Sequence, residues 1–318
     1  EKYVRQSADN ELARPTGDGI GTIEYNSNLA HLYAHFVRHT IDTSLEGLTI
    51  VYDGANGAAS SVGPEILSGL GAKVININVN PDGLNINHHC GSTHIEGLQV
   101  AVQQHNADLG IANDGDADRC LLVDEKGQVL DGDQIMLLCA LKLKEEGKLK
   151  GDTVVGTVMS NIGFHKAAEE LGMKTVSTAV GDRYVLEYMR EHNLSVGGEQ
   201  SGHVIFLDHN TTGDGMLTAV QVAALMKEKN QPLSELAGIM TKYPQVLINV
   251  RVATKTGWED NDIIKAAIVT AEGELGDEGR VLVRASGTEP LIRVMAEGPN
   301  QEELQSLCQE IADIIGRE

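Results

Sequence analysis

The chain of 318 residues is poor in aromatic residues, in cysteine and in positive charge, and each shortage excludes a class of protein. Aromatic residues make up 3%, so the hydrophobic core has to be built from Val, Ile, Leu, Ala and Met. The four cysteines show no C-x-x-C spacing, which argues against a zinc site or a disulfide framework and favours buried, reduced thiols. These shortages are typical of a cytoplasmic globular protein.

The charge balance narrows the set of expected partners. Lys and Arg number 25 against 46 Asp and Glu, which gives a formal net charge of −21. A surface of this sign repels phosphate backbones, so we do not expect nucleic acid as a partner. There is no run of eighteen apolar residues and no signal peptide, so we expect no membrane span. An acidic protein that handles an anionic substrate needs a local group of Arg or Lys.

Strand and helix patterns alternate along most of the chain, which predicts an α/β fold of mainly parallel sheets covered on both faces. Residues 1–22 are typical of the end of a preceding domain followed by a Pro/Gly linker, and the chain has no initiator Met. We expect two three-layer α/β/α domains at 23–128 and 129–244, and a smaller α+β domain at 245–318. The first helix should present one apolar face, formed by Leu29, Leu32, Tyr33, Phe36 and Val37.

The segment IANDGDADRCLLV places Asp114, Asp116 and Asp118 at every second position between two apolar runs. Three carboxylates this close repel one another unless a cation offsets their charge. Mg²⁺ prefers oxygen ligands, so a D-x-D-x-D turn after a strand suits this metal. Arg119 follows directly and could orient a phosphorylated partner beside the ion.

Two other interpretations of this turn remain open. Counted from Asp114, an EF-hand calcium loop finds acids at positions 1, 3 and 5 and Glu125 at position 12, but Arg119 stands where that loop needs glycine. Its flanks are also typical of strands rather than helices. The turn could instead be a solvated acidic loop without an ion. The apolar strands on either side favour the magnesium site.

A second candidate loop is the glycine-rich segment VGGEQSGHV, which predicts a tight turn presenting Glu199, Ser201 and His203. A carboxylate and a hydroxyl suit the vicinal hydroxyls of a sugar, whereas the alternative is a hairpin with a polar tip. In the segment AVGDRYV, Asp182 is explained as a helix N-cap, and Arg183 is a candidate substrate contact.

A third candidate loop is VRASGTEPLIRV, where a strand delivers Arg284 to the turn formed by Ser286, Gly287 and Thr288, and Arg293 returns on the next strand. Two guanidiniums around an S-G-T turn provide the donors of a phosphate cradle. This is one cationic group of the kind that the acidic surface requires. The alternative is a plain turn with an ion pair to the glutamate that follows the threonine.

These three loops resemble those of the α-D-phosphohexomutase superfamily. The resemblance covers essentially the whole chain in order: DGANGAAS, CGSTH, DGDADR, VGDRYV, GGEQSGH, TTGDG and RASGTEPLIRVM. GGEQSGH together with DGDADR favours the members that act on glucosamine phosphate over the glucose and mannose mutases, whose loops more often read GEMSGH and DGDGDR. The resemblance implies a four-domain protein with a TBP-like last domain, and this chain looks like domains 2, 3 and 4.

The resemblance also implies a reaction. A phosphoserine in domain 1 would give its phosphoryl group to glucosamine 6-phosphate and take the other one back from a sugar 1,6-bisphosphate. Glucosamine 1-phosphate would then enter UDP-N-acetylglucosamine and cell-wall synthesis. Asp114, Asp116 and Asp118 would hold Mg²⁺, and Arg119 would steady the phosphoserine. Family members without domain 1 would lack the phosphoserine, and the S-H-N-P-type serine segment is absent from this sequence, so we expect the chain alone to be inactive.

By the same resemblance, Glu199 and Ser201 would read sugar hydroxyls, and the five residues of the phosphate loop would hold the non-reacting phosphate. Ala179 stands where several relatives carry Lys, so His203 or Arg183 would have to assist catalysis. Asn113 replaces a more usual apolar residue before the aspartates, and the sequence does not explain this replacement. The family suggests a homodimer formed through domain 1.

Three alternative functions stay open at this point: a phosphoglucomutase or phosphomannomutase, a non-catalytic phosphosugar-binding module, and a structural calcium-binding protein built on the EF-like loop.

Overall fold

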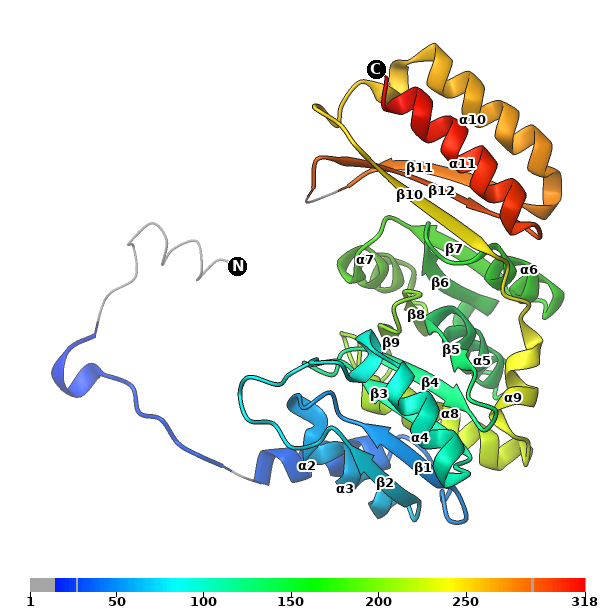
Figure 1. Ribbon diagram of the computed structural model, residues 1–318. Coiled ribbons are helices and arrows are strands. Elements are labelled where there is room, and N and C mark those ends of the chain that lie inside the picture. The colour runs from blue at the N-terminus through cyan, green and yellow to red at the C-terminus, as the bar shows by residue number, and fades with distance from the viewer. Residues whose placement is uncertain (1–14, 27, 287–288, 318) are drawn as a thin grey trace.

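A computed structural model describes residues 15–26, 28–286 and 289–317 of the chain. Three β-sheets follow one another from the bottom to the top of the molecule (Figure 1). Residues 15–26 are exposed and extend away from this body, with one 3-10 turn, η1 (Gly17–Gly19). Within the described ranges, no helix is long and apolar enough to cross a membrane.

The first sheet has the strand order β2-β1-β3-β4-β5. Its strands are β1 (Thr49–Asp53), β2 (Lys73–Ile77), β3 (Leu109–Asn113), β4 (Cys120–Asp124) and β5 (Val129–Leu130). Its helices are α2 (Asn28–Arg38), α3 (Val62–Gly69) and α4 (Glu96–His105), with the 3-10 turns η2 (Ala58–Ser60) and η3 (Gly91–Thr93). β1 pairs in parallel with β2 and β3, whereas β3–β4 and β4–β5 are antiparallel. The sheet is therefore mixed, because a short turn can join only antiparallel neighbours.

The second sheet has the order β7-β6-β8-β9 and is also mixed, since β8 and β9 are antiparallel. Its strands are β6 (Thr153–Thr157), β7 (Lys174–Thr178), β8 (Val196–Gly198) and β9 (Val204–Phe206). The helices of this part are α5 (Gly132–Glu145), α6 (Ile162–Glu170), α7 (Asp182–His192), α8 (Gly215–Lys229) and α9 (Leu233–Leu236), with η4 (Lys150–Asp152) and η5 (Ala237–Ile239). The antiparallel edge again follows from a short connection, the glycine-rich turn.

The third sheet is antiparallel throughout, with the order β10-β12-β11. Its strands are β10 (Gln245–Arg251), β11 (Arg280–Ala285) and β12 (Leu291–Glu297). The two helices α10 (Asp262–Leu275) and α11 (Gln301–Ile315) lie together on one face (Figure 1), and η6 (Trp258–Asp260) and η7 (Gly276–Glu278) flank α10. The α/β expectation for the first two parts and the α+β expectation for the last are confirmed.

One hydrophobic cluster spans the first two sheets, and each of these sheets also has a smaller cluster of its own. Helix α8 follows the second sheet in sequence, yet it packs against α2, β3 and β4 of the first part. Helix α5 similarly contacts both β4 and β8. The predicted boundary between residues 128 and 129 therefore divides the sequence, but elements on its two sides pack against each other.

Helix α2 buries less of its apolar face than the helical spacing predicts. Leu29, Leu32 and Phe36 are 61%, 64% and 39% exposed, whereas Ala34 and Val37 are fully buried. Among the described residues, α2 packs mainly against α3 and α8, and its Ala34 and Val37 belong to the hydrophobic core. The predicted helix is formed, and of the five residues assigned to its apolar face only Val37 is fully buried and Tyr33 partly buried.

A buried polar group joins the third sheet to the second. The carboxylate of Glu297 on β12 is fully buried and accepts hydrogen bonds from Arg280 Nε (2.7 Å) and from the N–H of Ile162 (2.9 Å). The N–H of Asn161 donates to Asp133 Oδ2 (2.8 Å) at the start of α5. These bonds tie together three elements that are far apart in sequence and fix where the third sheet sits.

Candidate functional site

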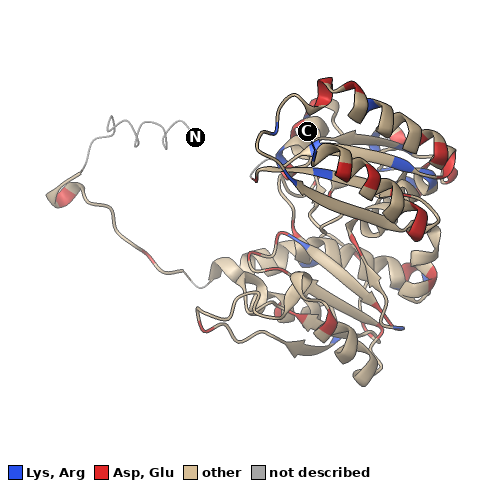
Figure 2. Ribbon diagram, turned by 45° about the horizontal axis from the view of Figure 1, so that its top comes forward, with Lys and Arg blue, Asp and Glu red and all other residues tan. Residues whose placement is uncertain are grey.

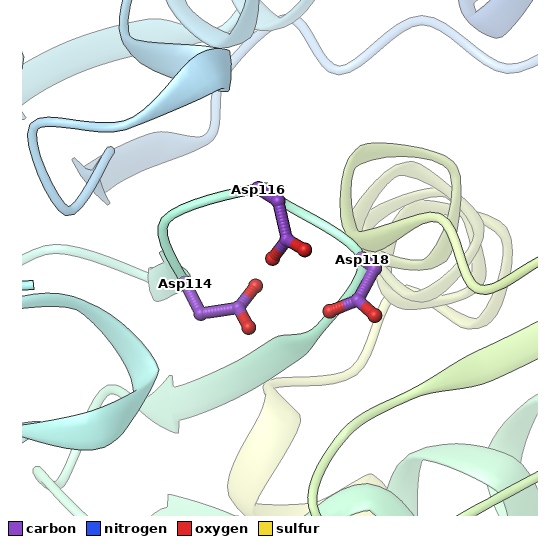
Figure 3. Close-up of side chains that lie close together, drawn as sticks. All are labelled: Asp114, Asp116 and Asp118. Atoms are coloured by element: carbon purple, nitrogen blue, oxygen red, sulfur yellow. The ribbon is translucent and has the colours of Figure 1, made fainter. Parts of the chain in front are cut away.

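The three aspartates of the D-x-D-x-D turn converge between β3 and β4 (Figure 3). One carboxylate oxygen from each of Asp114, Asp116 and Asp118 lies within 4.8 Å of the other two. Asp114 is buried, Asp118 is half-buried and Asp116 is exposed. Oxygen ligands at this spacing, with one side open to water, fit Mg²⁺, which keeps several water ligands.

The electrostatics of the turn also favour a cation. Burial and the neighbouring Asp118 raise the pKa of Asp114 to about 6, although the N–H of Arg119 donates to its Oδ1 at 3.2 Å. Arg119 Nε lies 3.7 Å from Asp114 Oδ2 and 3.8 Å from Asp118 Oδ1. One guanidinium faces three carboxylates, so a net negative charge remains for a divalent ion to neutralise.

The EF-hand interpretation does not survive the geometry of the turn. Glu125 follows β4 and accepts hydrogen bonds from the hydroxyl and the N–H of Ser234, away from the aspartate cluster. The flanking elements are strands β3 and β4, as the sequence indicates. The acid at position 12 therefore cannot complete a calcium loop around Asp114.

His203 comes from the glycine-rich turn but binds the metal turn. The side chain is 3% exposed, its Nδ1 lies 3.0 Å from Asp118 Oδ2, and the N–H of Gly213 donates to its Nε2 at 3.0 Å. Because an N–H can only donate, Nε2 acts as the acceptor and Nδ1 carries the proton. Both ring nitrogens are engaged, so this geometry suits a side chain that orients Asp118, and the catalytic role of His203 stays a prediction.

The metal turn and the glycine-rich turn are joined through their backbones. Arg119 and His203 form an antiparallel bridge, and the N–H of Cys120 donates to the carbonyl of Gly202 at 3.0 Å. Gly202 has φ +94°, and a Cβ there would lie 2.4 Å from the Cys120 carbonyl oxygen. Glycine is therefore required where the two turns meet, and their separation is fixed by main-chain contacts.

Glu199 and Ser201 lie in the turn between β8 and β9, as predicted. Glu199 Oε1 accepts a hydrogen bond from the N–H of Gly181 at 2.9 Å, and Ser201 is exposed. Helix α7 begins at Asp182, and Gly181 occupies the N-cap without a side-chain bond, so the predicted Asp182 cap is wrong. The hydrogen bond from Gly181 to the carboxylate of Glu199 instead holds this loop beside the glycine-rich turn.

Arg183 projects from the first turn of α7, next to the loop that Glu199 holds. Its side chain is 74% exposed, and its Nε lies 2.7 Å from Glu187 Oε1. Arg183 is therefore accessible beside the glycine-rich turn, but an ion pair already engages its guanidinium.

The predicted phosphate cradle lies between β11 and β12. Arg284 and Arg293 are direct partners in the antiparallel register, and burial together with Arg293 lowers the pKa of Arg284. The Nε atoms of both arginines are buried and have no hydrogen-bond partner among the residues that the structure describes. Ser286 is 3% exposed, whereas Gly287 and Thr288 lie outside the described residues.

The surroundings of this arginine pair are partly cationic and partly acidic. Arg293 Nη2 lies 3.2 Å from Glu289 Oε2, so the alternative ion pair predicted for this turn is formed as well. Lys255 Nζ donates to the Ser286 carbonyl at 2.7 Å and was not predicted from the sequence, because it belongs to a separate loop after β10. Asp and Glu residues are spread over the chain, while the strands of the third sheet carry several arginines (Figure 2). The end of β11 at Ala285 and the start of β12 at Leu291 lie on the same side of the molecule as α7 (Figure 1).

Three family models match consecutive parts of the chain. Residues 24–127 match the alpha/beta/alpha domain II of phosphoglucomutase/phosphomannomutase, residues 131–243 match its alpha/beta/alpha domain III, and residues 247–314 match its C-terminal domain. The matches follow one another in the order of the three sheets.

Curated relatives and solved structures agree with these family models. Phosphoglucosamine mutase of Desulforamulus reducens is 54% identical over 96% of this chain and 69% of its own length, and that of Symbiobacterium thermophilum is 54% identical over 100% and 71%. A phosphoglucomutase/phosphomannomutase family protein of Burkholderia thailandensis has a TM-score of 0.78 at 20% identity, covering 98% of this chain and 69% of that structure. The Aspergillus fumigatus N-acetylphosphoglucosamine mutase, in complex with GlcNAc-6P and magnesium, has a TM-score of 0.71 at 23% identity, covering 88% and 68%.

Proposed function

The chain belongs to the phosphoglucosamine mutases of the phosphoglucomutase/phosphomannomutase family, and we propose that it serves the interconversion of glucosamine 6-phosphate and glucosamine 1-phosphate. The observation that carries this proposal is the backbone junction between the metal turn and the glycine-rich turn at Arg119 and His203. That junction holds cation-binding and sugar-binding groups at a fixed separation, as transfer of a phosphoryl group to a sugar hydroxyl requires.

The metal turn is the site for Mg²⁺ in this proposal. Asp114, Asp116 and Asp118 would hold the ion, which neutralises charge on a phosphoryl group during transfer. Arg119 contacts two of these carboxylates and leaves part of its guanidinium exposed, so it can pair with a phosphate beside them. His203 keeps Asp118 oriented from behind.

The substrate is proposed to span two loops. Ser201 and Glu199 would contact the sugar hydroxyls, with Arg183 at the edge of the same region. The cradle of Arg284, Ser286 and Arg293, extended by Lys255, would hold the phosphate that does not react. A sugar 1,6-bisphosphate carries one phosphate at each end, so it can place either one in the cradle when it turns around.

We assign the three functional loops to three domains with boundaries at 23–128, 129–244 and 245–318. The phosphoryl donor of the reaction is the serine that the resemblance places in domain 1. In this proposal the three loops would supply the cation, sugar and phosphate contacts. Catalysis by these contacts consists mainly of positioning and charge neutralisation.

Calorimetric titration of the 318-residue chain with sugar phosphates in the presence of Mg²⁺ tests the proposal. Glucosamine 6-phosphate should bind more tightly than glucose 6-phosphate or mannose 6-phosphate, and inorganic phosphate should compete with all three. Tenfold tighter binding of mannose 6-phosphate would overturn the glucosamine preference. Conversion of glucosamine 6-phosphate by this chain without added domain 1 would overturn the assignment of the donor serine.

A further inference from the structure

Asn113 is the last residue of β3, immediately before the aspartate turn, and its side chain closes the base of that turn. We propose that Asn113, anchored by Tyr52, is a positioning residue that sets the spacing of the three carboxylates and so the affinity of the site for a divalent cation. This inference rests on the metal site of the proposed function.

The side-chain amide of Asn113 uses both its nitrogen and its oxygen in hydrogen bonds. Its Nδ2 donates to the carbonyl of Arg119 at 2.8 Å, and its Oδ1 accepts from the hydroxyl of Tyr52 at 3.0 Å. Asn113 and Tyr52 are fully buried. The last pair of the β3–β4 ladder is Asn113 with Cys120, so the Arg119 carbonyl lies just beyond the ladder. The amide therefore supplies the bond that closes the turn from residue 113 to residue 119.

The first residue of the neighbouring helix packs closely against this amide. A Cβ on Gly215, the first residue of α8, would lie 2.2 Å from Asn113 Nδ2 and 2.2 Å from the Arg119 carbonyl oxygen. The N–H of Gly215 in turn donates to the carbonyl of Ala117 inside the turn at 2.9 Å. The start of α8 thus packs against the hydrogen bond from Asn113 to Arg119. It also holds the middle of the turn through the hydrogen bond to Ala117.

The consequence for the carboxylates is direct. Asp114 follows Asn113, and Asp118 precedes Arg119, so the bond from Asn113 to Arg119 brings together the two residues that flank the outer carboxylates. Without it the ends of the turn can separate, and the like charges of Asp114 and Asp118 favour that separation. A cation must then pull the ligands together, which lowers its affinity. Losing a partner that orients metal ligands typically costs ~10–100-fold in metal affinity.

The competing explanation is that Asn113 is simply a satisfied buried amide that contributes to stability. Two substitutions of nearly unchanged shape separate the explanations. Asn113→Leu removes both hydrogen bonds of the amide, and Tyr52→Phe removes the anchoring hydroxyl, which also lies 3.2 Å from the carbonyl oxygen of Ala59. Ser195→Ala is the matched control, because Ser195 is 2% exposed and its hydroxyl donates to the Lys148 carbonyl at 2.8 Å, outside the site.

The test measures Mn²⁺ binding to the full chain from the electron paramagnetic resonance signal of free Mn²⁺, beside the thermal unfolding temperature of each variant. We expect Asn113→Leu to raise the Mn²⁺ dissociation constant about tenfold or more and Tyr52→Phe to raise it about threefold. Ser195→Ala should lower the unfolding temperature by a comparable amount with the dissociation constant unchanged. Wild-type affinity in Asn113→Leu, at a reduced unfolding temperature, would overturn the proposal.

Hydrogen exchange without metal separates this inference from the proposed metal site. The amides of Ala117 and Arg119, which bond to Asp114, should exchange at least tenfold faster in Asn113→Leu than in the wild-type chain and remain unchanged in Ser195→Ala. If the wild-type chain binds no Mn²⁺, both the proposed metal site and the effect of Asn113 on its affinity are overturned. The exchange rates would still show whether Asn113 holds the turn. Unchanged exchange in Asn113→Leu, with normal Mn²⁺ binding by the wild type, would overturn the closing role of Asn113 alone.

Discussion

Arg284 and Arg293 face each other across strands β11 and β12, and the Nε atom of each is buried with no hydrogen-bond partner in the described part of the chain. Glu289 pairs with Arg293, and Arg284 has no carboxylate partner among the residues that the structure describes. Two like charges held together in a partly buried place are unfavourable until an anion joins them. The arginine pair is therefore a place where binding of an anion should stabilise the fold.

Replacing Arg293 with Met tests this arrangement. Without ligand, the free energy of unfolding of the variant should equal that of the wild type or exceed it. One of two like charges is removed, while the apolar part of the side chain is retained. Inorganic phosphate at about 100 times its dissociation constant should stabilise the wild type by about 2.7 kcal/mol. The variant should lose most of this gain, as measured by urea unfolding with and without phosphate.

Arg190→Met is the matched control, because Arg190 is an exposed residue of α7 and does not belong to the third sheet. It should respond to phosphate like the wild type. Equal stabilisation of Arg293→Met and the wild type by phosphate would show that the anion binds elsewhere.

His203 offers a second test, since its two ring nitrogens have different partners. Asn at position 203 can keep a donor near the Nδ1 position, whereas Leu keeps neither nitrogen. We expect His203→Leu to weaken Mn²⁺ binding about tenfold and His203→Asn to weaken it about threefold or less. Calorimetric titration with Mn²⁺ measures both. Equal losses in the two variants would argue that the bond to Asp118 does not orient the metal ligand.

The local part of the site could be predicted from the sequence, because it depends on neighbours along the chain. Apolar runs on both sides of D-G-D-A-D predict two strands and a turn, and a turn this short brings its own carboxylates together. The same holds for the arginines at the ends of the S-G-T segment, since an antiparallel hairpin places them opposite each other. Chemistry carried by one turn is visible in one short stretch of sequence.

The contacts between distant segments could not be predicted. The sequence does not explain Asn113, because its partner Tyr52 lies on another strand. It indicates a substrate contact for His203, because Asp118 is far away in the sequence. The exposed Leu29 and Leu32 of α2 show the same limit for packing. Helical spacing indicates which residues share a face, but the elements that cover that face are set by tertiary structure.

Glu199 gives a third prediction, because its carboxylate holds Gly181 and is also proposed to contact the sugar. Glu199→Gln keeps an oxygen acceptor for the Gly181 N–H but loses the charge. It should weaken glucosamine 6-phosphate binding about tenfold, the loss expected for one charge-assisted hydrogen bond, without changing hydrogen exchange at Gly181. Glu199→Ala should weaken binding at least as much and also speed that exchange. Faster exchange in Glu199→Gln would mean that the charge, rather than the acceptor, holds the loop.

The last prediction concerns Asp133, which lies at the start of α5 where the second and third sheets meet. The residue is fully buried, its Oδ1 has no hydrogen-bond partner within the described ranges, and burial together with Asp131 raises its pKa from 3.8 to about 7. Between these two pH values the folded chain keeps a proton that the unfolded chain has released. Stability from this group is therefore present below about pH 4 and is lost as the pH rises to about 7.

Asp133→Asn should remove this loss, because the amide stays neutral at every pH while its oxygen still accepts from the N–H of Asn161. One pKa unit is about 1.4 kcal/mol, so even half of the shift makes the variant about 2 kcal/mol more stable than the wild type at pH 8. The difference should shrink toward zero at pH 4. Urea unfolding of both chains from pH 4 to pH 8 measures it, with the exposed Asp42→Asn as control. A difference that does not change with pH would mean that Asp133 is ionised in the folded chain throughout this range.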